Sequence, residues 1–173
     1  LRMLNAESDV AERVDAALAR PTGAGGVTFT PFLAGERSPF LDPALRGGFS
    51  GLSLATEPDD LTRAVLEGVA FSLRDVFDVM RPLGVPERLL ATGGGTRGEG
   101  WVRLLAEVLQ TPIGRPRAVP GAAHGAAVLA WRHLGIDVPK PAVERWVEPD
   151  SGEALEVAYA RYRSVTPPLE VTS

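Results

Sequence analysis

The chain has 173 residues, 45% of them hydrophobic, with a formal net charge of −4 and no cysteine. This length fits one domain or a piece of something larger, and the apolar share is large enough for a sizeable core, which excludes a disordered tail. Without cysteine there is no disulfide framework, thiolate zinc site or cysteine nucleophile, and without a long basic run nucleic acid is not expected as a partner.

The first third of the chain combines a predicted helix, a short strand and a long loop. Apolar residues recur at helical spacing within residues 5–20, with Ser8 as the expected N-cap, and a stretch rich in glycine at 21–26 ends this helix. Residues 27–33 are predicted to form a strand. The segment 34–51 has no sustained periodicity, which is typical of a functional or mobile loop.

Residues 59–81 carry the strongest helical pattern of the sequence, with Thr56 as the expected N-cap. The apolar stripe of this helix consists of Leu61, Val65, Leu66, Val69, Leu73, Val76, Phe77 and Met80. Arg63 and Glu67, like Arg74 and Asp78, are spaced four residues apart on the opposite face. We interpret this charged face as solvated.

The second half of the chain alternates predicted strands and helices. Strands are expected at residues 88–92 and 113–119, helices at 99–110, 121–133 and 152–163, and a linker at 139–149. A helix between two strands is typical of a parallel strand pair, so the chain is assigned to the α/β class. No apolar run reaches the roughly 18–20 residues of a membrane span, so we expect a soluble, cytoplasmic protein without a membrane partner.

The segment from Gly93 to Gly98 has the pattern G-x-G-x-x-G between a predicted strand and a predicted helix. This context suits a dinucleotide-binding turn, but no acidic residue follows at the required distance, so only an NADP-type site with Arg115 and Arg117 near a 2′-phosphate fits. The glycines also suit close packing of strand against helix, or a flat contact with the base and ribose of a nucleotide. Spacing alone does not separate these three interpretations.

The neighbouring sequence resembles a known family. Residues 32–39 read FLAGERSP and residues 42–52 read DPALRGGFSGL. The two parts of a family signature are matched by Gly47, Phe49, Gly51 and Leu52, and then by Asp60, Leu61, Ala64, Val65, Leu66 and Glu67. Residues 91–109 and 121–127 match a glycine loop with its helix and a helix of small residues. In this collinear order, over residues 25–134, the chain resembles the C-terminal half of FGGY-family carbohydrate kinases, and xylulokinases most closely.

The resemblance implies a ribonuclease-H-like α/β fold, as in actin and hexokinase, that is incomplete at its N-terminal side. Residues 1–173 would then be most of the C-terminal nucleotide-binding domain of a sugar kinase, with residues 139–173 as linker and C-terminal helix. The implied reaction transfers the γ-phosphoryl group of ATP, with Mg²⁺, to a sugar hydroxyl, with D-xylulose as the expected sugar. The family's catalytic aspartate and sugar-binding domain would lie upstream of Leu1, so no catalytic or metal-binding residue is assigned and the chain alone is expected to be inactive.

The resemblance places five residues at the nucleotide, namely Gly93, Gly94, Gly95, Thr96 and Gly98. At the last of these, glycine replaces a small polar residue that is often found after the family's glycine loop. This replacement removes one possible side-chain contact to the nucleotide.

Other polar residues have a functional and a structural interpretation. Glu36 and Arg37 either line the cleft, brace the domain interface or form a surface ion pair, and Arg46 either approaches a phosphate or anchors its own loop. Trp101 is expected to pack in the core rather than stack on a base, and His124 is expected to be closely packed.

Two alternatives to a kinase stay open, a non-catalytic nucleotide-binding or interaction module and an NADP-binding dehydrogenase domain. In the kinase interpretation, a sheet without its first strands leaves an unpaired edge, and Leu66, Leu73 and Phe77 lose part of their cover. We therefore expect a homo-oligomer or self-association through this edge, with a sugar and ATP as small-molecule partners.

Overall fold

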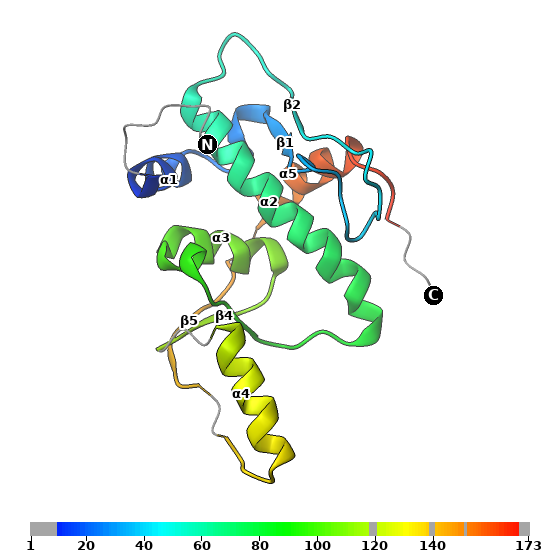
Figure 1. Cartoon of the computed structure of the whole chain (residues 1–173). Coiled ribbons are helices and arrows are strands. Elements are labelled where there is room, and N and C mark those ends of the chain that lie inside the picture. Colours follow the sequence, from blue (N-terminus) through cyan, green and yellow to red (C-terminus); the bar gives the residue numbers. More distant parts are fainter. Residues whose placement is uncertain (1–9, 118–120, 139–140, 151, 170–173) are drawn as a thin grey trace.

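The computed structural model describes residues 10–117, 121–138, 141–150 and 152–169 (Figure 1), so the expected N-cap Ser8 lies outside the described residues. The elements in chain order are α1 (Val10–Ala19), η1 (Ala24–Gly26), β1 (Thr28–Thr30), β2 (Gly48–Ser50), α2 (Pro58–Met80), η2 (Arg81–Leu83), β3 (Leu89–Leu90), η3 (Gly94–Arg97), α3 (Glu99–Leu109), β4 (Ile113–Pro116), α4 (Ala122–His133), β5 (Val143–Val147) and α5 (Glu153–Ser164). None of the helices in these ranges is long and apolar enough to cross a membrane.

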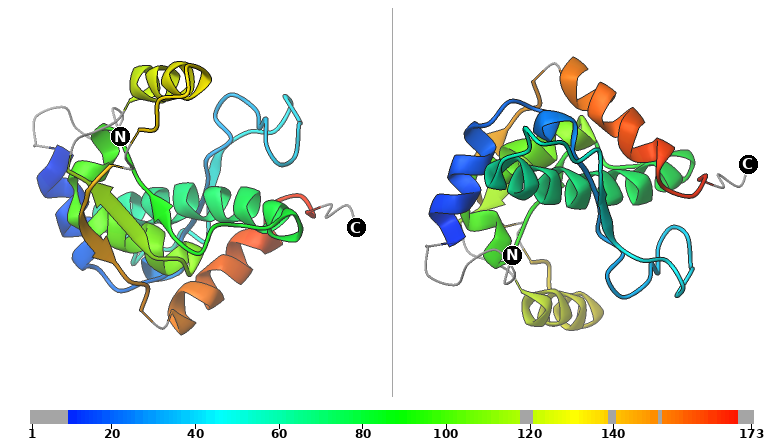
Figure 2. Two further views of the ribbon diagram at one scale, coloured as in Figure 1. Left: turned by 90° about the horizontal axis from the view of Figure 1, so that it is seen from below. Right: turned by 90° about the horizontal axis from the view of Figure 1, so that it is seen from above.

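Helix α2 lies at the centre of the molecule, and α1, β1, α3 and α5 pack on it (Figures 1 and 2). Its N-cap is Glu57, one residue later than the expected Thr56. The reason is local, because the Asp60 carboxylate in the first turn accepts the backbone N–H of Glu57 at 3.0 Å, whereas the Thr56 hydroxyl accepts the N–H of Ser53. The predicted helix at 59–81 is otherwise confirmed.

The strands form two separate sheets. One holds β3, β4 and β5 in that order, with β3 parallel to β4 and β5 antiparallel to it. The parallel β3–α3–β4 unit confirms the predicted α/β pattern. The other sheet pairs β1 with β2 antiparallel and places Phe29 opposite Phe49. The strand predicted at 27–33 is confirmed as β1. Two predictions were wrong, because the loop predicted at 34–51 contains β2, the partner of β1, and the predicted linker contains β5, whose Trp146 lies against Gly114 of β4.

The main core lies between α2, α3, β4 and α5. Phe71 of α2 is its aromatic centre, with ring centroids 5.5 Å from both Tyr159 and Tyr162 of α5. Helix α5 therefore completes the core from the far end of the chain.

The Arg63–Glu67 part of the charged face of α2 is buried and Arg74 and Asp78 are only partly exposed, so the prediction that this face is solvated was wrong. Arg63 and Glu67 are only 5% and 2% exposed, and Arg63 Nε donates to Glu67 Oε1 at 2.7 Å. Glu67 also accepts the backbone N–H of Gly23 at 2.9 Å, and Arg63 donates to the Leu18 carbonyl and the Thr22 hydroxyl. The pair is tolerated inside because α1 and the turn after it supply these further hydrogen bonds.

The opposite, apolar side of α2 is only partly covered. Leu73 is 45% exposed and Leu66 is partly exposed, as predicted. Phe77 does not follow the prediction, because it is buried in the main core with the Arg81 guanidinium 5.2 Å from its ring centroid.

Candidate functional site

The glycine loop of residues 93–98 leaves the carboxyl end of a parallel strand. The N–H groups of Leu89 and Ala91 donate to the carbonyls of Pro112 and Gly114, which holds β3 against β4. The loop then passes through η3 into α3, whose apolar residues lie in the main core. In open α/β sheets this end of the strands is where ligands bind.

The turn at the start of the loop is closed from within. The Thr96 hydroxyl and backbone N–H both donate to the Gly93 carbonyl, at 2.8 and 3.2 Å. Gly93 has φ +103°, a conformation that L side chains rarely adopt, so the backbone itself requires glycine there. Thr96 acts as the brace of the turn.

The space around the next two glycines separates the interpretations of the loop. A Cβ built on Gly94 meets nothing within 4 Å, and one built on Gly95 meets only the Trp101 indole at 3.9 Å. At Gly68, by contrast, a Cβ would lie 2.1 Å from the Phe29 carbonyl oxygen. Close packing therefore explains Gly68 but does not explain Gly94, which is exposed with open space in front of it.

Trp101 lies beneath this loop. Its side chain is partly buried and packs against the main core, in line with the predicted packing role. The same indole is the group nearest to the Cβ position of Gly95, so Trp101 connects the loop to the main core.

The other candidate residues do not come together in one site. Arg46 donates to two carbonyls of its own loop at 2.8 and 2.7 Å, which is the anchoring role. The Glu36 carboxylate accepts the Ser38 N–H at 2.8 Å, and Arg37 is exposed beside a shallow depression of about 370 Å³ in the same loop. His124 is exposed, so its predicted close packing was wrong, because α4 has no buried residue.

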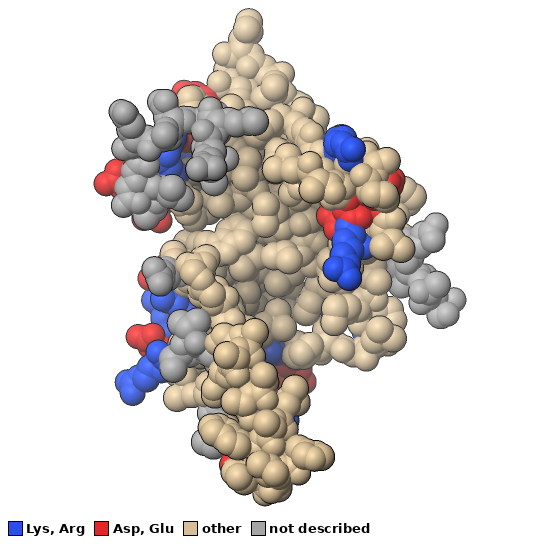
Figure 3. All heavy atoms as spheres, in the orientation of Figure 1, with Lys and Arg blue, Asp and Glu red and all other residues tan. Residues whose placement is uncertain are grey.

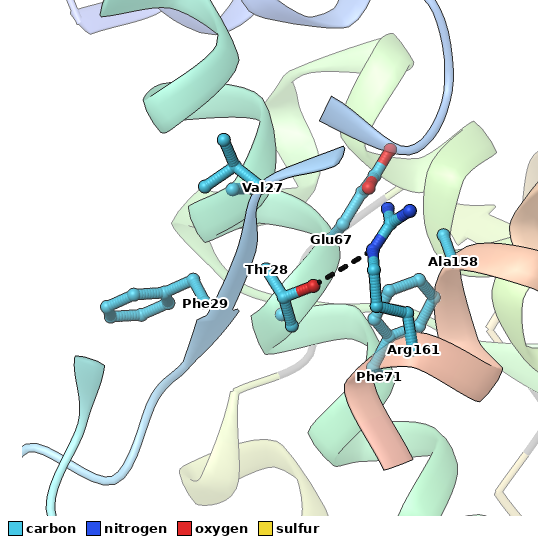
Figure 4. A pocket seen from close by; sticks show the side chains of 9 residues that line it. Val27, Thr28, Phe29, Glu67, Phe71, Ala158 and Arg161 are labelled. Carbon is cyan, nitrogen blue, oxygen red and sulfur yellow. Dashed lines mark hydrogen bonds between the residues drawn. The ribbon is translucent and has the colours of Figure 1, made fainter. Parts of the chain in front are cut away.

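A hollow between β1, α2 and α5 is a packing junction rather than a ligand site (Figure 4). Arg161 reaches across it, donating from Nε to the Thr28 hydroxyl at 3.1 Å and from Nη2 to the Gly23 carbonyl at 2.8 Å. The remaining space is too small for a water molecule. This junction fixes the turn at residues 20–26 to both helices.

A second buried polar group was not found from the sequence. Asp75 of α2 is fully buried, accepting the Tyr159 hydroxyl at 2.7 Å and Arg163 Nη1 at 3.2 Å. Burial raises the pKa of the Asp75 carboxyl, although both partners favour its charged form, and burial with Asp75 beside it also raises the pKa of Tyr159. The spacing of four residues from Glu67 through Phe71 to Asp75 places Asp75 on a buried face of α2. The sequence does not show its partners, because they lie on the last helix, α5.

Residues 2–134 match the C-terminal domain of the FGGY family of carbohydrate kinases. The chain belongs to this family. Among its relatives are the xylulose kinase of Staphylococcus epidermidis, 38% identical over 72% of this chain and 25% of the relative, and the gluconokinase of Bacillus subtilis, 35% identical over 69% of this chain and 23% of the relative. The structure of a ligand-bound xylulose kinase from Lactobacillus acidophilus matches with a TM-score of 0.84 and 26% identity, over 95% of this chain and 35% of that one.

These comparisons confirm the predicted family and its actin-like α/β fold. The chain spans about a quarter of the length of the curated relatives that it matches. The relatives are named for two different sugars, so membership alone leaves the sugar open. Membership in a carbohydrate kinase family argues against the dehydrogenase alternative.

Proposed function

We propose that this chain is the nucleotide-binding part of an ATP-dependent sugar kinase, with the glycine loop lying flat against the base and ribose of ATP. The proposed contacts are Gly93, Gly94, Gly95, Thr96 and Gly98. The observation that carries the proposal is the open space in front of Gly94, where neither packing nor backbone conformation accounts for glycine. A ligand surface close to the backbone does account for it, because any Cβ would hold that surface away.

The electrostatics of the loop favour the base and ribose over the phosphates. Glu99 in the first turn of α3 places a carboxylate near the helix N-terminus, and this carboxylate pairs with Arg145 of β5. A phosphate near this end would meet that negative charge, whereas the neutral base and ribose would not. The same carboxylate argues against a pyrophosphate-binding turn of the dinucleotide type.

The proposed activity of the whole kinase is transfer of the γ-phosphoryl group to a sugar hydroxyl, with D-xylulose as the proposed sugar and the cytoplasm as the proposed compartment. Phosphoryl transfer needs positioning and charge stabilisation, which Mg²⁺ supplies when it is bound. Among the described residues, no three His, Cys, Asp or Glu side chains are grouped to hold a metal ion, so we assign no step through Mg²⁺ to this chain. The chain alone is expected to bind ATP without phosphorylating a sugar.

Calorimetric titration with ATP tests the site. Gly94→Val is expected to weaken binding by about tenfold or more with an unchanged unfolding midpoint, because the new side chain enters the ligand side and not the core. Gly121→Val is the matched control, since Gly121 is also exposed with nothing within 4 Å of its Cβ position. Equal affinity of the Gly94 variant and the wild type would contradict the proposed contact.

A second candidate function is a nucleotide-binding module without chemistry. Release of ADP with D-xylulose and ATP separates the two at the level of the isolated chain. Turnover would show that catalytic groups lie within these residues, against our expectation. Tighter binding of NADP⁺ than of ATP would overturn both functions.

A further inference from the structure

The loop of residues 31–47, which joins β1 to β2, is held on the body by few side chains. Phe40 and Leu45 are partly buried against the main core, and the Phe40 ring meets the edge of buried Phe32 at a centroid distance of 5.7 Å. Leu41, next to Phe40, is 77% exposed. Figure 3 shows positive and negative side chains together over this loop, so its outer part is solvated. The position of the loop therefore depends on the contacts of Phe40 and Leu45.

Arg163 of α5 connects Phe40 to two further segments. Its guanidinium lies 5.7 Å from the centroid of the Phe40 ring, which is within the range of a cation–π interaction. Its Nη1 donates to Asp75 Oδ2 of α2 at 3.2 Å, and its Nη2 donates to the Pro167 carbonyl at 2.6 Å. The Arg163 side chain is only 19% exposed, and Asp75 is the carboxylate that pairs with it in the described part of the chain. Arg163 therefore ties the loop to α2 and to the segment after α5.

The two oxygens of the buried Asp75 carboxylate have different partners. Oδ1 accepts the Tyr159 hydroxyl at 2.7 Å, whereas Oδ2 accepts Arg163. The guanidinium over Phe40 is therefore held through one oxygen of this carboxylate. The other charged or titratable groups around this pair are Arg74 and Asp78 on α2, Glu156, Tyr159 and Tyr162 on α5, and Asp42 on the long loop.

The Tyr162 hydroxyl offers an acceptor for a proton carried by Asp75. Tyr162 is fully buried, and its hydroxyl has no hydrogen-bond partner among the described residues. Burial and the neighbouring Asp75 raise the pKa of Tyr162. A buried hydroxyl without a partner is rare in folded proteins and calls for an explanation. A neutral Asp75 carboxyl has an O–H group to donate, and it gains an acceptor in Tyr162 when it leaves Arg163.

We propose that Asp75 and Arg163 form a proton-operated latch, which fixes the loop of residues 31–47 while Asp75 is ionised and frees it when Asp75 is protonated. The ionised carboxylate holds the Arg163 guanidinium over the Phe40 ring. Protonation removes the negative charge, so the mostly buried cation loses its carboxylate partner and turns to water, away from Phe40. Because burial raises the pKa of Asp75, the latch opens at a pH above 3.8, the ordinary value for an aspartate.

A distance measurement between two spin labels tests the latch. The chain has no cysteine, so the labels attach at Arg37→Cys in the loop and Val157→Cys on α5, two exposed positions. We expect a narrow distance distribution at neutral pH, which broadens by about twofold or more as the pH is lowered toward 3.8. Circular dichroism at each pH shows whether the helices stay folded. No nucleotide is present, so the result does not depend on the proposed ATP site.

Three substitutions in the labelled chain make the test specific. Asp75→Asn keeps the shape of the side chain without its charge, and we expect the broad distribution at neutral pH and no further change in acid. Phe40→Leu keeps the Asp75–Arg163 pair and removes the ring, so it is also expected to broaden the distribution at neutral pH. Glu156→Gln is the control, because it neutralises a half-exposed carboxylate between the same two helices that pairs with Arg74. We expect it to behave as the wild type does.

Four results would overturn the proposal. The first is a distribution that is already broad in the wild type at neutral pH, which would show that the loop is not fixed. The second is a wild-type distribution that stays narrow until the helices unfold. The third and fourth are narrow distributions at neutral pH in a folded Asp75→Asn variant or in Phe40→Leu. If Asp75→Asn does not fold, the wild-type titration and Phe40→Leu decide the question.

Discussion

Replacement of Glu67 by glutamine tests the buried ion pair of α2. Glutamine keeps the size of the side chain and still accepts the backbone N–H of Gly23, so the main loss is the negative charge beside Arg63. Both side chains are almost fully buried, and a buried cation without its partner costs about 3–5 kcal/mol. Against a typical stability of about 5–15 kcal/mol, this is a large part of the total.

The assay is urea unfolding followed by fluorescence of the three tryptophans, with Glu99→Gln as the control. Glu99 pairs with Arg145, but both side chains are about half exposed, so the loss of that pair is expected to cost about 0–1 kcal/mol. The double variant Arg63→Met with Glu67→Leu removes both charges and is expected to recover most of the loss. A cost of Glu67→Gln no larger than that of the control would refute the reasoning.

Three further predictions concern backbone contact, pH and assembly. Gly68→Ala is expected to destabilise the chain by about 1–3 kcal/mol or more, because its Cβ would meet the Phe29 carbonyl at 2.1 Å, whereas Gly125→Ala, with nothing within 4 Å, is expected to stabilise α4 by about 0.5–1 kcal/mol in the same thermal melts. The pKa of the Asp60 carboxyl is lowered because the backbone N–H of Glu57 donates to it. The ionised carboxylate therefore contributes its full stabilisation above the ordinary pKa of 3.8, and this stabilisation is lost as the pH falls through the lowered pKa. Asp60→Asn should therefore flatten the decline of unfolding free energy as the pH falls below 3.8 in urea titrations, and equal slopes would contradict this. Self-association of the isolated chain at micromolar concentration stays a prediction, and a strictly monomeric species in sedimentation velocity would count against it.

Periodicity predicted what depends on neighbours in the sequence. The helices α2, α3, α4 and α5 lie close to their expected ranges because each has its own apolar spacing. The glycine loop lies between a strand and a helix, as expected from the same local pattern. The resemblance to the family, carried by motifs in collinear order, is confirmed by the comparisons.

Distant contacts were beyond the reach of these patterns. A spacing of four residues between Arg63 and Glu67 is the same for a solvated pair and a buried one, and only the turn that covers them makes the difference. The partners of Asp75 lie 84 and 88 residues away, so no local window contains them. The five residues of β5 stand between prolines, which made the segment look like a linker.

The last helix has a consequence for the order in which the chain folds. Arg161 of α5 holds the Gly23 carbonyl across a separation of 138 residues. At a synthesis rate of roughly 5–20 residues per second, about 7–28 s pass between the making of the turn and the making of the residue that fixes it. During this time the turn, β1 and the polar side of α2 lack their partner helix. We expect nascent chains that end before α5 to be cut by proteases near residues 20–30, and chains that include α5 to resist.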